Sequence, residues 1–232
     1  MLETQKGWCF FMDSSSWFSL KLSLQVASIA TALILLFGVS LAYLLAMKNF
    51  RGKEIADMLF TLPLVLPPTV TGYYLIVLFG RRGLIGRPLF EATGWSFMFT
   101  WQAAVLASFV VALPLMIKTA RAAIESVDKN LIRASYTLGH SEFSTAMKVI
   151  FPLAGKGVIA GTVLSFARAM GEFGATLMLA GNIPGKTDTM PLAIYSLAGS
   201  GEWSEAHAMV MLLTAISGLF LYIANRCGKR LI

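Results

Sequence analysis

The sequence predicts an all-α integral membrane protein with about five transmembrane helices and a polar cytoplasmic helix-turn-helix. The first observation is composition: 56% of the 232 residues are hydrophobic and only 13% are charged, whereas soluble domains carry about 25% charged residues. The second is that four stretches lack charged side chains and match the roughly 20 apolar residues that a membrane-spanning helix needs. These stretches are residues 22–47, 58–80, 92–117 and 206–225. The third is the clustering of basic residues in alternate loops, which is typical of multi-pass membrane proteins.

The chain before the first span is rich in Trp and Phe, which are enriched at membrane–water interfaces. Residues 1–18 are therefore expected to form an interfacial segment, with an additional helix left open. The transmembrane domain is expected to cover residues 19–226, and residues 227–232 a short cytoplasmic tail.

The second span, residues 58–80, contains three prolines, Pro63, Pro67 and Pro68. Each proline removes a backbone donor and bends a helix. In lipid, such a break survives only where neighbouring protein or a water-filled cavity satisfies the freed backbone groups. Two interpretations stay open: a kink that helps helices to pack, or a broken helix beside a conduction path.

The third span, residues 92–117, is followed by a long polar segment, residues 122–151, whose apolar side chains recur three and four positions apart. Gly139 divides this segment, and Ser141 is a residue type that starts helices. The pattern predicts a cytoplasmic helix-turn-helix that is too polar to cross the bilayer. An element this long in a small membrane protein is expected to contact a partner, although a plain connector is the alternative.

The fifth span, residues 152–180, is interrupted by Arg168 and Glu172. At a spacing of four, the two side chains lie on one helical face and can form an ion pair. Such a pair either ties helices together or lines a path for an anion, because charged groups at membrane depth face the protein interior or water. The small residues of this span favour close helix packing in lipid; they are Gly157, Gly161, Gly171 and Gly174. The uncharged stretch at residues 189–201 is too short to cross and is predicted to be re-entrant or interfacial.

The distribution of Lys and Arg predicts the orientation. With five spans, most of the 19 basic residues fall on one side together with the C-terminus, so we expect a cytoplasmic C-terminus and an external N-terminus. The net charge of +7 reflects this bias and not an affinity for nucleic acid. The outer loop carries Arg81, Arg82 and Arg87. Three interpretations stay open: these side chains form a solvated surface, attract an anionic solute, or bind an acidic partner.

The stretch AGNIPGKT, residues 180–187, nearly matches a phosphate-binding loop, G-x-x-x-x-G-K-[ST]. The position that requires the first glycine is Ala180, and Gly181 lies one place too close. The predicted topology also places this stretch outside, away from cytoplasmic ATP. We therefore expect no nucleotide site on this chain.

The polar segment contains RASYTLGHSEFSTAMKVIFPLA, which resembles the cytoplasmic signature of permease subunits of ABC importers: Glu-Ala-Ala, three residues, Gly, nine residues, Ile-x-Leu-Pro. Phe151 replaces the leucine of the signature, and Arg133 stands where the glutamate is expected. The resemblance implies that residues 122–151 are a coupling loop that docks on a separate ATPase subunit. The residues of the loop expected to serve coupling are Arg133, Ala134, Ser135, Leu138, Gly139, Val149 and Pro152.

Two longer stretches, LPLVLPPTVTGYYLIVLFGRRGLIG and RAMGEFGATLMLAGNIPGKTDTMPLAIY, resemble the permease of molybdate importers. This resemblance implies the type I ABC importer permease fold, transport of molybdate or tungstate, and a multi-pass protein of the bacterial inner membrane. The residues expected to form the translocation path or gate are Pro63, Pro67, Pro68, Arg168, Gly171, Glu172, Gly174 and Thr176.

The resemblance also implies partners: a second copy of the permease, two cytoplasmic ABC ATPase subunits that carry ATP and Mg, an extracytoplasmic molybdate-binding protein, and membrane lipid. This chain is expected to hold no cofactor, metal or catalytic residue. A sulfate or thiosulfate permease is the alternative of the same class.

Two other classes are weighed. A stand-alone secondary carrier of anions is disfavoured because no second broken helix is evident to pair with the proline-rich one. An intramembrane enzyme is disfavoured because His140 and His207 fall on opposite sides and cannot complete a site.

Overall fold

The computed structural model describes the backbone of residues 14–230 and the side chains of residues 14–222. All regular secondary structure in this part of the chain is helical, as predicted. The elements in chain order are α1 (Ser14–Met47), α2 (Lys53–Val65), α3 (Pro68–Phe79), α4 (Gly86–Thr93), α5 (Trp101–Glu125), α6 (Lys129–Thr137), α7 (Glu142–Thr145), the π-helical turn η1 (Ala146–Ile150), α8 (Phe151–Met170), α9 (Gly174–Ala180), α10 (Met190–Ser200) and α11 (Trp203–Arg230).

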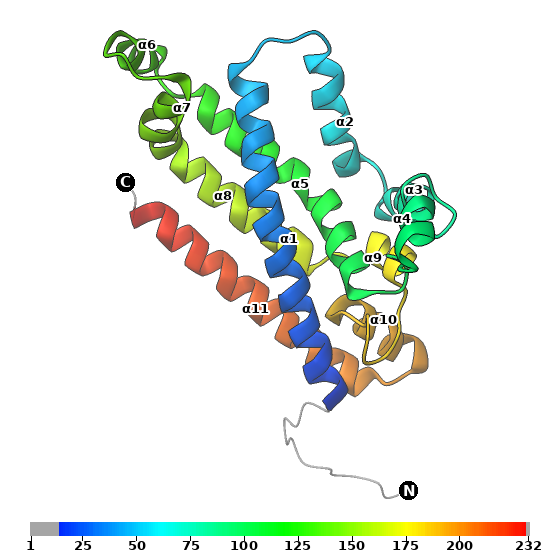
Figure 1. Cartoon of the computed structure of the whole chain (residues 1–232). Helices are drawn as coiled ribbons and strands as arrows, with labels where there is room; N and C mark the ends of the chain where they lie inside the picture. Colours follow the sequence, from blue (N-terminus) through cyan, green and yellow to red (C-terminus); the bar gives the residue numbers. More distant parts are fainter. Residues whose placement is uncertain (1–13, 231–232) are drawn as a thin grey trace, which may run out of the picture.

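Five segments account for the predicted spans. Four helical stretches are long and apolar enough to cross a bilayer, and the bent pair α2–α3 makes a fifth if it counts as one span. Those four are Ser14–Met47, Trp101–Glu125, Glu142–Met170 and Trp203–Tyr222. In Figure 1, α11 runs back toward the end of the molecule that holds α6 and α7, whereas α1 begins at the opposite end. Because α1 begins at Ser14, the end of the predicted interfacial segment 1–18 belongs to this helix; residues 1–13 lie outside the described residues.

The core forms around α5, which packs between α1 and α8 (Figure 1). Small residues bring these helices close together, as their spacing in α8 predicts. A Cβ atom added at Gly38 of α1 would lie 2.7 Å from Cγ of Met116 on α5, and one added at Gly161 of α8 would lie 2.9 Å from Sδ of the same methionine. The two glycines therefore let α1 and α8 approach α5 from both sides.

We expect Gly161→Leu to lower the stability of the protein by about 1–3 kcal/mol, the usual cost of forcing extra methylene groups into a packed interior. Gly155 on the same helix is the matched control, because a Cβ added there meets nothing within 4 Å. The melting temperature of the detergent-solubilised protein should fall for Gly161→Leu and stay unchanged for Gly155→Leu. Equal losses for both variants would contradict the packing role of Gly161.

The predicted break in the second span is confirmed. The axes of α2 and α3 differ by 120°. Leu66 is extended, with φ −71° and ψ 144°, because a residue that precedes a proline avoids the helical region. Pro68 then starts α3 at a position where a missing backbone N–H costs nothing. Pro63 lies inside α2, about one turn before the break.

The predicted bounds of the third span, residues 92–117, are wrong. Residues before α5 form the short helix α4, which ends at Gly94 with φ 70°. The spanning helix starts after Thr100, whose side chain accepts a hydrogen bond from the N–H of Ala103 at 3.2 Å. It continues through Lys118 and Arg121 to Glu125, because these long side chains form ion pairs on its surface instead of ending it.

The predicted fifth span is also divided. α8 ends at Met170, and α9 begins at Gly174 after a three-residue break. The uncharged stretch that is too short to cross forms α10, which has 11 residues and packs against α11 and α1.

Candidate functional site

The coupling loop folds as the predicted helix-turn-helix. The carboxylate of Asp128 accepts a hydrogen bond from the N–H of Asn130 at 2.8 Å and caps α6. Gly139 follows α6 with φ 80°, a left-handed conformation that glycine adopts without steric cost. Ser141 starts α7, because its Oγ accepts a hydrogen bond from the N–H of Ser144 at 3.2 Å. The break at Gly139 and the helix start at Ser141 are therefore confirmed.

A buried pair of hydroxyl groups holds the two arms of this loop together. Ser135, which occupies an alanine position of the signature, is 4% exposed, and Thr145 is fully buried. Their hydroxyl oxygens lie 2.9 Å apart, and either can be the donor. The N–H of His140 also donates to the carbonyl of Ser135 at 3.2 Å. The serine at this alanine position thus makes a hydrogen bond across the turn.

The end of the loop contains a local irregularity that the proline explains. An α-helical residue at Pro152 would lack the N–H for its hydrogen bond, and its ring would clash with the carbonyl of Lys148. The chain widens into η1 instead, where the N–H of Phe151 donates to the carbonyl of Ala146. Val149 is half-buried in this turn, and Pro152 is exposed at the start of α8.

Apolar side chains are exposed at the tip of the coupling loop. Leu138 is 79% exposed and Phe143 is 76% exposed, on either side of Gly139. Arg133 and Ala134, the first two positions of the signature, are exposed on α6. Large apolar groups on an otherwise polar tip indicate a contact surface for another protein.

The predicted ion pair between Arg168 and Glu172 is present, with 2.7 Å between Nη1 and Oε2. The prediction placed both residues on one helix, and this detail is wrong, because Glu172 lies in the break after α8. The other carboxylate oxygen of Glu172 accepts a hydrogen bond from the N–H of Ala175 at 2.8 Å. The side chain of Glu172 is 1% exposed and that of Arg168 is 30% exposed. One buried carboxylate therefore joins the end of α8 to the start of α9.

The breaks in the second and fifth spans meet in space. A Cβ added at Gly174 would lie 2.9 Å from Cβ of Pro68 and 3.2 Å from the N atom of Thr69, so the starts of α9 and α3 touch. One turn further along, a Cβ added at Gly72 would lie 2.9 Å from Cα of Ala175. The structure thus brings together Pro68 and Gly174, two of the predicted path residues that are far apart in the sequence.

The other predicted path residues lie around this contact. Thr176 is 1% exposed in the first turn of α9, and its hydroxyl has no partner within the described part of the chain. Gly171 is exposed in the break, and Pro67 is exposed just before α3. Gly171 and Thr176 thus lie on either side of the start of α9, and Pro67 directly precedes Pro68, which touches it.

The structure contains a charged cluster between α2 and α5 that was not predicted from the sequence. Nζ of Lys118 lies 2.9 Å from one carboxylate oxygen of Asp57, and Nη1 of Arg121 lies 3.1 Å from the other. Asp57 directly precedes the uncharged stretch 58–80, and a carboxylate at the edge of a span is a sequence feature that suggests a basic partner. The cluster attaches α2, which has no buried residue, to the core.

In residues 180–187, which nearly match a phosphate-binding loop, backbone donors bond to side chains close by in the sequence. The N–H of Ile183 donates to Thr187 Oγ1 at 3.0 Å, and that of Gly185 donates to the carboxylate of Asp188 at 3.0 Å. The same carboxylate accepts a hydrogen bond from Ser19 Oγ on α1 at 3.1 Å, and burial raises the pKa of this group above its usual range. Two backbone donors of the loop are therefore used within the loop, and Asp188 also attaches the loop to α1.

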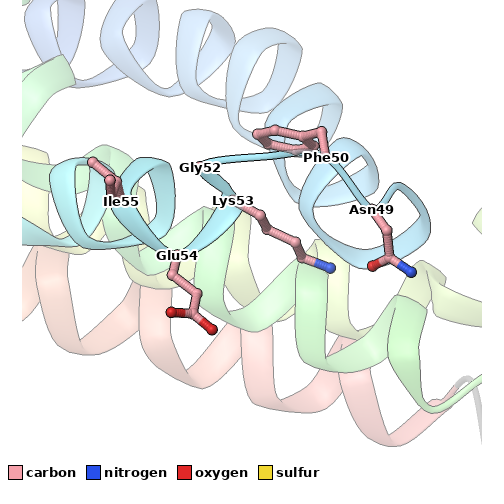
Figure 2. Close-up of a pocket in the computed structure, with 6 residues that line it drawn as sticks. All are labelled: Asn49, Phe50, Gly52, Lys53, Glu54 and Ile55. Atoms are coloured by element: carbon pink, nitrogen blue, oxygen red, sulfur yellow. The ribbon is translucent and has the colours of Figure 1, made fainter.

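A cavity of about 440 Å³ lies at the turn between α1 and α2 (Figure 2). The side chains of Asn49 and Lys53 extend to the same side of this turn, and Gly52 passes it with φ 88°. None of the predicted coupling or path residues lines this cavity.

Residues 23–230 match the sequence profile of the family described as "Binding-protein-dependent transport system inner membrane component". The chain belongs to this family. It is thus the membrane component of a transport system and not an enzyme. Family membership also disfavours a stand-alone secondary carrier, because the family is described by binding-protein-dependent transport.

Relatives within this family cover most of the chain. The "Molybdenum transport system permease protein ModB" of Escherichia coli (strain K12) is 44% identical over 92% of this chain and 94% of its own length. The "Putative molybdenum transport system permease protein YvgM" of Bacillus subtilis (strain 168) is 42% identical over 88% of this chain and 90% of its own.

Solved structures of ABC importers share the fold. A chain of a bacterial transporter involved in the import of the acidic polysaccharide alginate superposes with a TM-score of 0.79 at 13% identity, covering 95% of this chain and 81% of that one. A chain of the MetNI methionine transporter gives 0.69 at 16% identity, covering 94% of each. The predicted ABC importer permease fold is confirmed.

Proposed function

We propose that this permease carries molybdate, and tungstate as a close analogue, across the bacterial inner membrane in an ATP-driven importer. The observation that carries the proposal is 44% identity over 92% of the chain to a permease named for molybdenum transport. The working unit would be a homodimer, because five spans are few to enclose a path and a symmetric pair can build one on its axis. An extracytoplasmic molybdate-binding protein delivers the anion.

Two cytoplasmic ABC ATPase subunits, which carry ATP and Mg, drive the permease through its coupling loops. The exposed Leu138 and Phe143 support this part of the proposal, since they offer apolar anchors that an ATPase cleft can cover. The orientation follows: the coupling loop and the C-terminus lie in the cytoplasm and the N-terminus lies outside, as the distribution of basic residues predicts.

The path through the membrane runs beside the meeting point of the two broken spans. Exposed prolines at the start of α3 and the exposed Gly171 support this placement, because irregular backbone at membrane depth lines a path or is covered by protein. Arg168, 30% exposed beside the buried Glu172, presents positive charge there to a dianion.

The substrate is tested by uptake in a strain that lacks its own molybdate permease but retains the ATPase and the binding protein. Expression of this chain should restore uptake of labelled molybdate at micromolar concentration. Tungstate in tenfold excess should compete, and sulfate in the same excess should not. Restoration of sulfate uptake, insensitive to molybdate, would replace the proposal with the sulfate permease alternative.

A further inference from the structure

The coupling loop has an attachment to the core besides its own backbone. Glu142, the first residue of α7, is held by the end of α1. The hydroxyl of Tyr43 donates to one carboxylate oxygen at 3.2 Å, and Nζ of Lys48 lies 2.7 Å from the carboxylate. Tyr43 lies near the C-terminal end of α1, and Lys48 directly follows this helix. Both donors therefore bind Glu142 from the same end of α1.

The backbone route from the loop to the core passes through η1. A π-helical turn is a rare and locally widened part of a helix, and here it separates α7 from α8. It offers a point at which α7 can bend relative to α8. The contacts of Glu142 with α1 lie on the α7 side of this point, and they therefore bridge it.

We propose that Glu142 is a positioning residue for energy coupling: it fixes α7 to α1 across the π turn, so that a movement of the coupling loop reaches α1 as well as α8. α1 packs along α5 through most of its length, which carries the movement into the core. This inference rests on the proposed function, because it requires an ATPase that moves the loop.

The size of the effect follows from the exposure of the pair. The side chains of Lys48 and Glu142 are 46% and 47% exposed, and exposed ion pairs contribute little to stability. Loss of the contact should therefore spare folding and assembly. It should lower the number of anions moved per ATP hydrolysed by roughly two- to fivefold, a loss that small changes in interaction energy produce.

The experiment uses the complete importer in liposomes, with labelled molybdate uptake and phosphate release measured on the same sample. Glu142→Gln should lower the ratio of molybdate moved to ATP hydrolysed, with the same amount of ATPase subunit bound. The exchange of charges in Lys48→Glu with Glu142→Lys should restore most of this ratio, which a merely local structural defect would not do. Tyr43→Phe removes one contact only and should give an intermediate ratio.

Glu91→Gln is the matched control, because the pair of Arg87 and Glu91 is also exposed but lies within the single helix α4. Its ratio should equal that of the unaltered protein. An unchanged ratio in Glu142→Gln, or a lowered ratio that the charge exchange leaves unrestored, overturns the inference. If Glu142→Gln fails to assemble, an unchanged ratio in Tyr43→Phe overturns it instead. Failure of the proposed function is distinct, since the unaltered importer would then move no molybdate.

Discussion

Replacing Gly139 with valine should abolish transport while the protein remains in the membrane. Gly139 has φ 80°, a left-handed conformation that costs about 1–2 kcal/mol for a residue with a side chain and more for a β-branched one. An added Cβ meets nothing within 4 Å, so the defect arises from the backbone and reaches the angle between α6 and α7. We expect uptake to fall at least about tenfold, because one misplaced docking element of this kind costs more than its strain energy alone.

The control for this prediction is Gly52, which has φ 88° and equally open surroundings in the turn between α1 and α2 (Figure 2). Gly52→Val introduces the same strain outside the coupling loop and should retain uptake. Gly139→Asn should retain part of it, because asparagine tolerates the left-handed region. Membrane amount, co-purified ATPase and uptake are measured together, and full uptake by Gly139→Val would show that the turn is not part of the coupling surface.

Arg168→Ala should be the most destabilising single change among the predicted site residues. It leaves the carboxylate of Glu172, which is 1% exposed, without its ion-pair partner. Breaking a buried pair by removing one side costs about 3–5 kcal/mol. The yield of folded protein in detergent and its melting temperature should both fall, and uptake should fall with them.

A second substitution separates charge from shape at this position. Glu172→Gln in the Arg168→Ala background removes the orphaned charge and retains an oxygen for the N–H of Ala175. This double variant should recover most of the lost stability. If it is stable and transports normally, the pair is structural only and lies outside the path; if Arg168→Ala alone is as stable as the unaltered protein, the account of Glu172 as a buried partner is wrong.

Local signals in the sequence predicted the coupling loop well. Gly139 and Ser141 act on their immediate neighbours, and such turn and capping preferences are readable from a few residues. The bounds of the third span were wrong because hydropathy does not register caps: Gly94 ends one helix and Thr100 starts the next within a continuous apolar stretch. Lys118 and Arg121 looked like the end of a span, but they pair with acidic residues and stay in α5.

Long-range contacts could not be predicted in the same way. Nothing near Pro68 in the sequence indicates that it touches Gly174. Lys48 and Glu142 lie too far apart in the sequence for helical periodicity to predict their ion pair. The pair of Arg168 and Glu172 was found through its spacing of four residues, yet the helix that this spacing assumes ends at Met170. The pairing survives because Glu172 caps α9 from the break.

The close contact of α3 with α9 has a consequence for how the proposed path would open. Gly72 and Gly174 let the two short helices pack so closely that an added Cβ would overlap Met178 or Pro68, so neither helix can tilt without displacing the other. The two helices are therefore expected to move as one rigid unit. We expect such a unit to open the proposed path in a single step, without a stable half-open form.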